Sequence, residues 1–284
     1  MKKRFTLVFF LCLIALYAYP QSETPPEEYT YDEGNNLKIY CIKPADFDPN
    51  KSYPAILIFH GGGWSIGEAS WGFGSARHYA SKGMVAFSVQ YRLQDSTTII
   101  TPYESVLDAQ SSIRWVRQHA EKFAVNPDKI AAYGWSAGAH LAACAAVFEN
   151  LHRPDEKISS APNLLALKSP ALSLMLYPNF QTRLGDKIEV EKISPAEHVS
   201  KETPASIIVI GKTDTVTPIE GAELYHKNML AKGNDSELHI YEGVGHLFTP
   251  SSEPDDDWPN PDKKIVQEAQ NAIDAFLQKH GYIR

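Results

Sequence analysis

Cysteine is scarce in this sequence, with 3 among 284 residues, so a disulfide framework does not hold the fold. Long apolar runs are also lacking, because the run at residues 5–18 is only 14 residues long and a membrane-spanning helix needs about 20. Positive charge is in short supply as well, with 27 basic against 34 acidic residues. The resulting acidic surface argues against nucleic acid or an anionic membrane as the main partner.

What the chain does have is enough apolar side chain for a core, at 43% hydrophobic residues against 21% charged. This balance excludes disorder as the general state of the chain. A single α/β domain can reach this length, and no internal repeat is visible.

The N-terminus resembles an export signal. Lys2, Lys3 and Arg4 form a positive region ahead of the apolar run, and Pro20 then ends any helix. These features predict a signal peptide over residues 1–22 and a mature domain over 23–284 that is secreted or periplasmic. An uncleaved membrane anchor is the alternative, but the short run predicts no stable membrane insertion after processing.

Cleavage between Ala18 and Ser22 would leave Cys41 and Cys144 as the remaining cysteines. They could pair in an oxidising compartment. Cys144 lies in an apolar helical stretch, however, which favours a buried free thiol.

Strand-like and helix-like segments alternate along the chain. Apolar runs typical of strands occur at 37–42, 54–59, 84–90, 129–133, 171–177, 205–210 and 237–241. Segments typical of helices occur at 75–82, at 103–123, in the Ala-rich stretch that follows Gly134 and ends near residue 148, and at 263–280. This order predicts an α/β fold with a mostly parallel central sheet and helices on both faces. The connections are of ordinary length, so we expect no large cap domain and an open site that does not bury long acyl chains.

A nucleophilic serine is indicated by Gly134-Trp135-Ser136-Ala137-Gly138, which fits G-x-S-x-G. The pattern alone is weak, but a strand ends just before it and a helix begins within it. Such a strained strand-to-helix turn exposes a serine Oγ beyond the sheet edge. The alternative is a plain serine N-cap with helix-packing glycines.

A second glycine-rich segment, His60-Gly61-Gly62-Gly63-Trp64, follows the strand at 54–59. Phosphate binding fits poorly, because a P-loop needs Lys where this chain has Glu68, and the dinucleotide pattern fails at Ile66. We expect an oxyanion hole instead, with backbone N–H donors at Gly61, Gly62 and Ala137.

The serine also needs a base and an acid, which in this kind of fold follow it in the order acid, then histidine. Of Asp155, Asp186, Asp214 and Asp235, only Asp214 directly follows a predicted strand end, and His246 lies in the loop after another strand. We therefore predict Asp214 as acid and His246 as base.

Metal or cofactor chemistry is not expected, because neither H-E-x-x-H nor C-x-x-C occurs. Trp64, Trp135 and Phe248 flank the site loops. They either line an acyl or leaving-group pocket or have only a packing role in the fold.

These residues resemble the α/β-hydrolases, and within them the carboxylesterases with an H-G-G-G-W oxyanion loop, such as the secreted bacterial acetyl xylan and feruloyl esterase-like group. The likeness extends to the following positions: Tyr91-Arg92, Asp108, Ile113 to Val116, Ser194-Pro195, Thr217-Pro218 and Gly245-His246. It implies a Ser-Asp-His esterase without a cofactor that acts on short-acyl esters of plant polysaccharide. Two departures are Thr215 to Pro218, where Val-Pro is more usual, and the acidic segment Glu253 to Trp258.

Three rival functions use the same residues. A serine exopeptidase shares the fold but usually carries an added gating domain, for which this sequence has no room. A general carboxylesterase without carbohydrate preference needs no change to the site. A non-catalytic receptor usually lacks one triad member, and here all three types of residue are present. The oligomeric state is not predicted.

Overall fold

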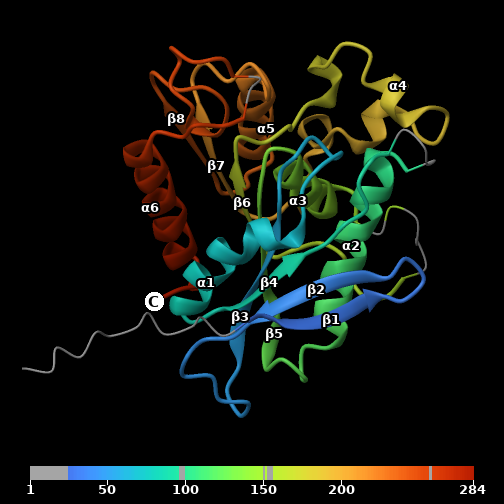
Figure 1. The fold of residues 1–284 in the computed structure, drawn as a ribbon, viewed down its shortest axis with the longest axis vertical. Coiled ribbons are helices and arrows are strands. Elements are labelled where there is room, and N and C mark those ends of the chain that lie inside the picture. Colours follow the sequence, from blue (N-terminus) through green and yellow to red (C-terminus); the bar gives the residue numbers. More distant parts are fainter. Residues whose placement is uncertain (1–24, 96–99, 150, 152–155, 256–257) are drawn as a thin grey trace, which may run out of the picture.

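The computed structural model describes residues 25–95, 100–149, 151, 156–255 and 258–284 (Figure 1). The predicted signal peptide and its cleavage point lie outside these ranges, as does Asp155. Within them, no helix is long and apolar enough to cross a membrane.

The centre of the molecule is an eight-stranded sheet with the order β1-β2-β4-β3-β5-β6-β7-β8. The strands are β1 (Glu27–Asp32), β2 (Leu37–Ile42), β3 (Tyr53–Phe59), β4 (Val85–Val89), β5 (Val125–Trp135), β6 (Leu164–Lys168), β7 (Ser206–Gly211) and β8 (Ser236–Tyr241). β2 runs antiparallel to both of its neighbours, and the strands from β4 to β8 are parallel. The carboxyl ends of the parallel strands therefore meet at one edge of the sheet.

Helices cover both faces of this sheet (Figure 1). They are α1 (Phe73–Ser81), α2 (Pro102–Gln118), α3 (Ala137–Val147), α4 (Gln181–Leu184), α5 (Ile219–Ala231) and α6 (Lys263–Lys279). Helices α1 and α6 share one core layer, whereas α2, α3 and α5 share the other. Along β3 the side chains alternate between the layers, with Leu57 in one and Ile56 and Ile58 in the other. The predicted α/β-hydrolase fold class is confirmed.

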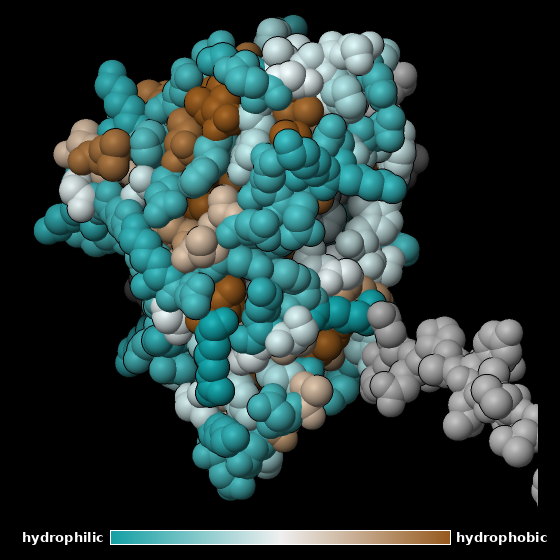
Figure 2. All heavy atoms as spheres, turned by 90° about the vertical axis from the view of Figure 1, so that its left-hand side faces the viewer, coloured by the Kyte–Doolittle hydropathy of each residue, from teal (hydrophilic) through white to brown (hydrophobic). Residues whose placement is uncertain are grey.

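The outer face of α6 is polar, while Ile273 and Phe276 pack inward. The side of the molecule that carries α6 is accordingly mostly hydrophilic, with hydrophobic residues in separate patches (Figure 2). The inward face of α6 is thus a core face, as its amphipathic pattern requires.

The strand predicted at 171–177 is wrong. The strand at this place in the sheet is β6, which lies earlier in the chain and pairs with β5 and β7. Met175 and Leu176 are 53% and 44% exposed, and residues 174–176 form a 3₁₀ helix. An interior strand covered on both faces cannot leave such side chains exposed, which is why this apolar run is not a strand.

The earlier position of this strand has a consequence for the site, because the connection between β6 and β7 runs from residue 169 to residue 205. It carries α4 and several 3₁₀ turns, and it is longer than the sequence led us to expect. β1 was not predicted either, since its sequence EEYTYD is mostly polar, as suits the edge of a sheet.

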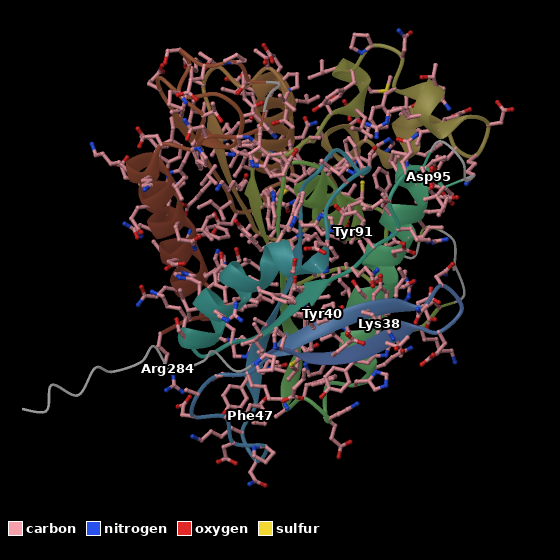
Figure 3. All side chains as sticks on the ribbon, viewed as in Figure 1. Lys38, Tyr40, Phe47, Tyr91, Asp95 and Arg284 are labelled. Atoms are coloured by element: carbon pink, nitrogen blue, oxygen red, sulfur yellow. The ribbon has the colours of Figure 1, made fainter. Side chains whose placement is uncertain are left out.

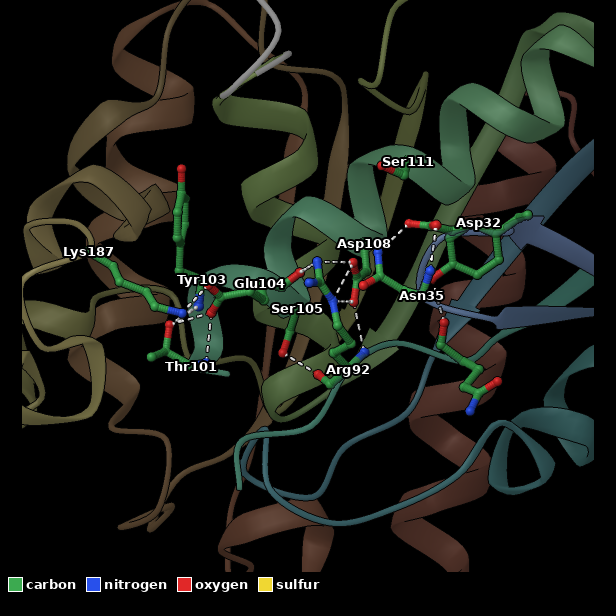
Figure 4. A network of polar contacts seen from close by, with 12 residues as sticks. Asp32, Asn35, Arg92, Thr101, Tyr103, Glu104, Ser105, Asp108, Ser111 and Lys187 are labelled. Atoms are coloured by element: carbon green, nitrogen blue, oxygen red, sulfur yellow. Dashed lines mark hydrogen bonds and ion pairs between the residues drawn. The ribbon is translucent and has the colours of Figure 1, made fainter. Parts of the chain in front are cut away.

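A polar network ties the end of β4 to α2 (Figure 4). The buried Asp108 carboxylate accepts hydrogen bonds from the Arg92 guanidinium, at 2.6 Å from Nη2, and from the Arg92 backbone N–H at 2.8 Å. Thr101 and Glu104 form a capping box at the start of α2, and Lys187 from the β6–β7 connection pairs with Glu104. The network therefore joins three segments that surround the carboxyl edge of the sheet.

Candidate active site

Ser136 lies in the tight turn between β5 and α3. Its backbone has φ 54° and ψ −123°, a strained conformation for a residue with a side chain. Two glycines make the turn possible: a Cβ on Gly138 would lie 2.1 Å from the Phe59 carbonyl oxygen, and one on Gly134 would lie 2.5 Å from the Gly138 backbone. This is the strand–turn–helix geometry expected from the sequence, and it presents the serine hydroxyl at the sheet edge.

The structure brings Ser136, His246 and Asp214 together from the loops after three different strands. His246 Nε2 lies 3.0 Å from Ser136 Oγ, and His246 Nδ1 lies 3.0 Å from Asp214 Oδ2. A carboxylate can only accept, so Nδ1 carries the proton and Nε2 is free to accept from the serine hydroxyl. All three side chains are buried, which shields these hydrogen bonds from water.

Thr217 holds the Asp214 carboxylate in place. Its backbone N–H donates to Oδ1 at 2.7 Å and its hydroxyl donates to Oδ2 at 2.8 Å, while Val216 N–H adds a third bond at 3.1 Å. Sequence reasoning counted Thr217-Pro218 in the resemblance and Thr215 to Pro218 as a departure from it, but gave Thr217 no role in the site. The sequence did hold a signal for this role, namely a threonine three residues after the acid, because Thr and Asp side chains often form hydrogen bonds with residues close to them in the chain.

Asp255 joins the loop of the acid to the loop of the base. Its Oδ1 accepts from the His246 backbone N–H, and its Oδ2 accepts from the Thr215 N–H at 2.7 Å and from the Thr215 hydroxyl at 3.1 Å. The approach is so close that a Cβ on Gly245 would lie 2.3 Å from Asp255 Oδ1. This contact gives a structural role to one residue of the acidic segment that the sequence left unexplained.

The rejected acid Asp235 lies away from Ser136, in an ion pair with Lys279 at 2.8 Å and beside His280 at 3.2 Å. It precedes β8, whereas Asp214 follows β7. The two carboxylates therefore lie at opposite edges of the sheet, as the sequence predicted.

The glycine-rich loop lies beside Ser136. Gly62 and Gly63 line the cavity next to Ser136, whereas Gly61 lies behind Trp135, where an added Cβ would be 2.7 Å from its ring. Behind the loop lies Tyr91, which follows β4 and is labelled in Figure 3. Its ring stacks on that of His60, with 4.3 Å between ring centres. The loop is thus supported from within the core.

Two cavities meet at Ser136. The first, of about 540 Å³, is lined mainly by aromatic and apolar side chains. The polar side chains of His246 and Asp255 also line it. The second, of about 440 Å³, is lined by the β6–β7 connection and by Trp64. Trp135 lines the first cavity, so both predicted tryptophans face the site.

Phe248 was expected to flank the pocket but belongs to the core. It is fully buried and packs against Tyr241, with 5.3 Å between ring centres. The chain turns sharply at His246 to Phe248, with φ 51° at Leu247, and this turn points the ring inward.

A buried histidine supports Trp64 from below. Trp64 Nε1 donates to His140 Nδ1 at 3.3 Å, and His140 Nε2 donates to the Ile193 carbonyl at 2.7 Å. Burial lowers the pKa of His140 to about 4. Cys144, one turn along α3, is buried and unpaired, and so is Cys41, which confirms the free-thiol interpretation.

The low pKa of His140 predicts a loss of stability in mild acid. The unfolded chain takes up a proton near the usual histidine value of about 6.5, whereas the folded chain resists it down to about pH 4. Stability therefore falls as the pH drops through this window, by about 2 kcal/mol at pH 5. Urea unfolding at pH 7 and pH 5 measures this loss, and His140→Gln should reduce it. Equal losses in the two proteins would contradict the role of His140.

In the part of the chain that the structure describes, no three His, Cys, Asp or Glu side chains gather as potential metal ligands. The histidine of the site instead contacts a hydroxyl and a carboxylate. The residues that the site does contain are suited to nucleophilic attack by the serine.

Two family models match the chain. One, described as BD-FAE, matches residues 39–169, and the model of the prolyl oligopeptidase family matches residues 106–280. Among solved structures, the apo form of Thermogutta terrifontis esterase 2 is 35% identical, with a TM-score of 0.81. The match covers 94% of this chain and 98% of that one. The same esterase has been solved phosphorylated by paraoxon and with butyrate bound.

Curated relatives are more distant. A probable carboxylic ester hydrolase, LipM of Mycobacterium tuberculosis, is 25% identical over 68% of this chain and 48% of its own length. Endo-1,4-beta-xylanase B of Butyrivibrio fibrisolvens is 26% identical over 68% of this chain and 32% of its own length. The chain thus spans about half or less of these two relatives.

Proposed function

Because this chain belongs to the α/β-hydrolase serine esterases, we propose that it hydrolyses short-acyl esters of plant polysaccharide through Ser136, Asp214 and His246. The observation that carries the proposal is the unbroken line of hydrogen bonds from Asp214 through His246 to Ser136, at the point where two cavities meet.

In this mechanism Ser136 Oγ attacks the ester carbonyl while His246 Nε2 takes its proton. The same proton then passes to the oxygen of the leaving alcohol, and water later releases the acyl group by the reverse path. Asp214 holds the imidazole in the required tautomer and stabilises it when charged.

The developing oxyanion is bound by backbone N–H groups of the glycine-rich loop and of Ala137. From the loop, the sequence predicted Gly61 and Gly62 as donors. Gly62 and Gly63 are better placed, because they line the cavity at Ser136 while Gly61 lies behind Trp135. No cofactor is needed for these steps.

Three observations support a secreted enzyme acting on acylated carbohydrate. The positively charged and apolar start of the chain resembles an export signal. The relative from Butyrivibrio is named as a xylanase, which acts on a plant polysaccharide. The first cavity also exposes tryptophan side chains, which suit a sugar ring.

Mass spectrometry of acyl groups released from a panel of acetylated and feruloylated polysaccharides tests this function. We expect release of acetate from at least one acetylated polysaccharide, with Ser136→Ala as the blank. Hydrolysis of small esters without any release from the panel would leave a general carboxylesterase and reject the carbohydrate preference.

A peptidase is the second candidate, because the prolyl oligopeptidase family model covers the segment that holds all three site residues. Among the described residues that line the first cavity, Asp255 is the carboxylate, and it already accepts hydrogen bonds from His246 N–H and from Thr215, which leaves fewer of its acceptor sites for a peptide's amino group. We expect release of nitrophenol from 4-nitrophenyl acetate without release of nitroaniline from an aminoacyl-4-nitroanilide. The opposite result would favour the peptidase.

A further inference from the structure

Three of the five tryptophans of this chain line the cavity at Ser136: Trp71, Trp135 and Trp258. Trp258 is 73% exposed and Trp71 is 39% exposed, although large aromatic side chains usually bury most of their surface. Their rings lie 5.7 Å apart at 89°, so together they form a corner with two apolar walls. Exposed aromatic walls beside a reactive group are typical of a ligand site.

The two walls contact each other, and one of them contacts the glycine-rich loop. Trp71 lies in a short 3₁₀ helix, Ala69–Gly72, and contacts the ring of His60 at the start of the glycine-rich loop, with 5.8 Å between ring centres. Trp258 lies three residues after Asp255, whose carboxylate is bound to the His246 loop. The corner therefore lies in the same cavity as Ser136, with Trp71 in contact with the start of the glycine-rich loop.

The position of His246 shows which half of the ester this cavity receives. His246 must hand its proton to the leaving alcohol oxygen, so the alcohol leaves on the side of the cavity that His246 lines. His246 lines the first cavity, whereas the second is lined by Trp64, Tyr177 and Phe180. The alcohol half therefore belongs with the tryptophan corner and the acyl half with the second cavity.

We propose that Trp71 and Trp258 form a sugar-binding corner, in which the pyranose ring that carries the ester stacks on an indole face. The inference rests on the proposed function and adds to it the place and the residues of carbohydrate recognition. A pyranose presents one face of C–H groups, and these are attracted to the negative face of an aromatic ring. Its hydroxyl groups stay at the rim and remain hydrated.

The exposure of the corner favours a sugar over a hydrocarbon alcohol. A hydrocarbon chain gains binding free energy only where its surface leaves water, which requires enclosing walls. A polysaccharide needs the reverse, a wall open enough for the chain to continue past the ester on both sides. Trp258, with nearly three quarters of its surface in solvent, is such a wall.

The test compares two acetate esters that differ only in their alcohol: acetylated xylo-oligosaccharide and methyl acetate, whose methyl group is too small to reach the corner. For Trp258→Ala and Trp71→Ala, we expect the ratio of kcat/KM for the oligosaccharide to that for methyl acetate to fall at least about tenfold. The loss should appear mainly in KM. Trp258→Phe, which keeps an aromatic face, should recover most of it.

Leu230→Ala is the matched control, because Leu230 is also a large exposed apolar residue, 54% exposed, but lies on α5 outside both cavities. Its ratio should equal that of the wild type. A further readout does not depend on turnover: xylo-oligosaccharide without acetyl groups should change the tryptophan fluorescence of the wild type, and less so that of Trp258→Ala.

The outcomes separate the two proposals. If the wild type hydrolyses methyl acetate but not the acetylated oligosaccharide, the proposed carbohydrate function fails. If the wild type hydrolyses both and the ratio is unchanged in Trp258→Ala and Trp71→Ala, the function stands and the sugar-binding corner is wrong.

Discussion

Ser136→Ala should remove nearly all ester hydrolysis, with kcat lowered at least about 10³-fold. Alanine has no hydroxyl, so no acyl-enzyme can form, and His246 Nε2 loses the group that lies 3.0 Å from it. The residue count in the turn is unchanged, and the strained backbone is held by glycines on either side. Turnover of 4-nitrophenyl acetate by the purified proteins gives the measurement.

Covalent labelling provides a check that is independent of turnover. Paraoxon should add one diethyl phosphate to the wild type, and digestion with mass spectrometry should place it on Ser136. The alanine variant should stay unlabelled while showing the same circular dichroism spectrum. Activity above a tenth of the wild-type value in a folded variant, or a label on another residue, would contradict the assignment of Ser136 as the nucleophile.

Asp214→Asn should lower kcat by about 10³- to 10⁴-fold with little change in KM. An amide in place of the carboxylate cannot stabilise the imidazolium, and its NH₂ group can turn towards His246 Nδ1 and favour the wrong tautomer. Thr217 N–H and its hydroxyl, which now donate to the two carboxylate oxygens, would help to decide which way the amide turns. Steady-state kinetics on a short-acyl ester measures the effect.

Asp235→Asn is the matched control, since it makes the same chemical change at the opposite edge of the sheet. Asp235 is partly exposed and pairs with Lys279, an ion pair of the kind that contributes little to stability. Its kcat should stay within about twofold of the wild type. Similar losses in the two variants would mean that the acid of the site has been assigned to the wrong strand end.

The predicted triad came from a simple geometric rule rather than from detailed secondary structure. Parallel strands end at one edge of the sheet, so side chains just after such strands are candidates to meet. Ser136, Asp214 and His246 each follow a strand, and the hydrogen bonds between them show that they do meet. The rule works because β5 and β7 end in apolar runs next to glycine, and β8, although half polar, pairs in parallel with β7 and so ends at the same edge.

The same reliance on apolar runs explains the errors. Residues 171–177 are as apolar as a strand, yet Pro170 precedes them and the sheet position is already taken by β6. Only pairing with neighbouring strands distinguishes the two segments, and pairing cannot be read from one sequence. The donors of the glycine-rich loop remain a prediction, because the direction of each N–H in such a loop depends on φ values that glycine leaves open.

Phe248 and Asp255 show a further limit of sequence reasoning. Both lie within ten residues of His246, and one points into the core while the other binds the backbone of the site. Their roles depend on the turn after His246, where Leu247 adopts a positive φ that its sequence does not announce. Proximity along the chain was thus a poor guide to what these side chains contact.

The bridge made by Asp255 affects how the site opens. The amides of Thr215 and His246 donate to different oxygens of the same Asp255 carboxylate, so a displacement of Asp255 removes an anchor from both loops at once. In the language of local unfolding, the loops after β7 and β8 belong to one cooperative unit. The acid and the base therefore come apart together, and an open state with one of them aligned is not favoured.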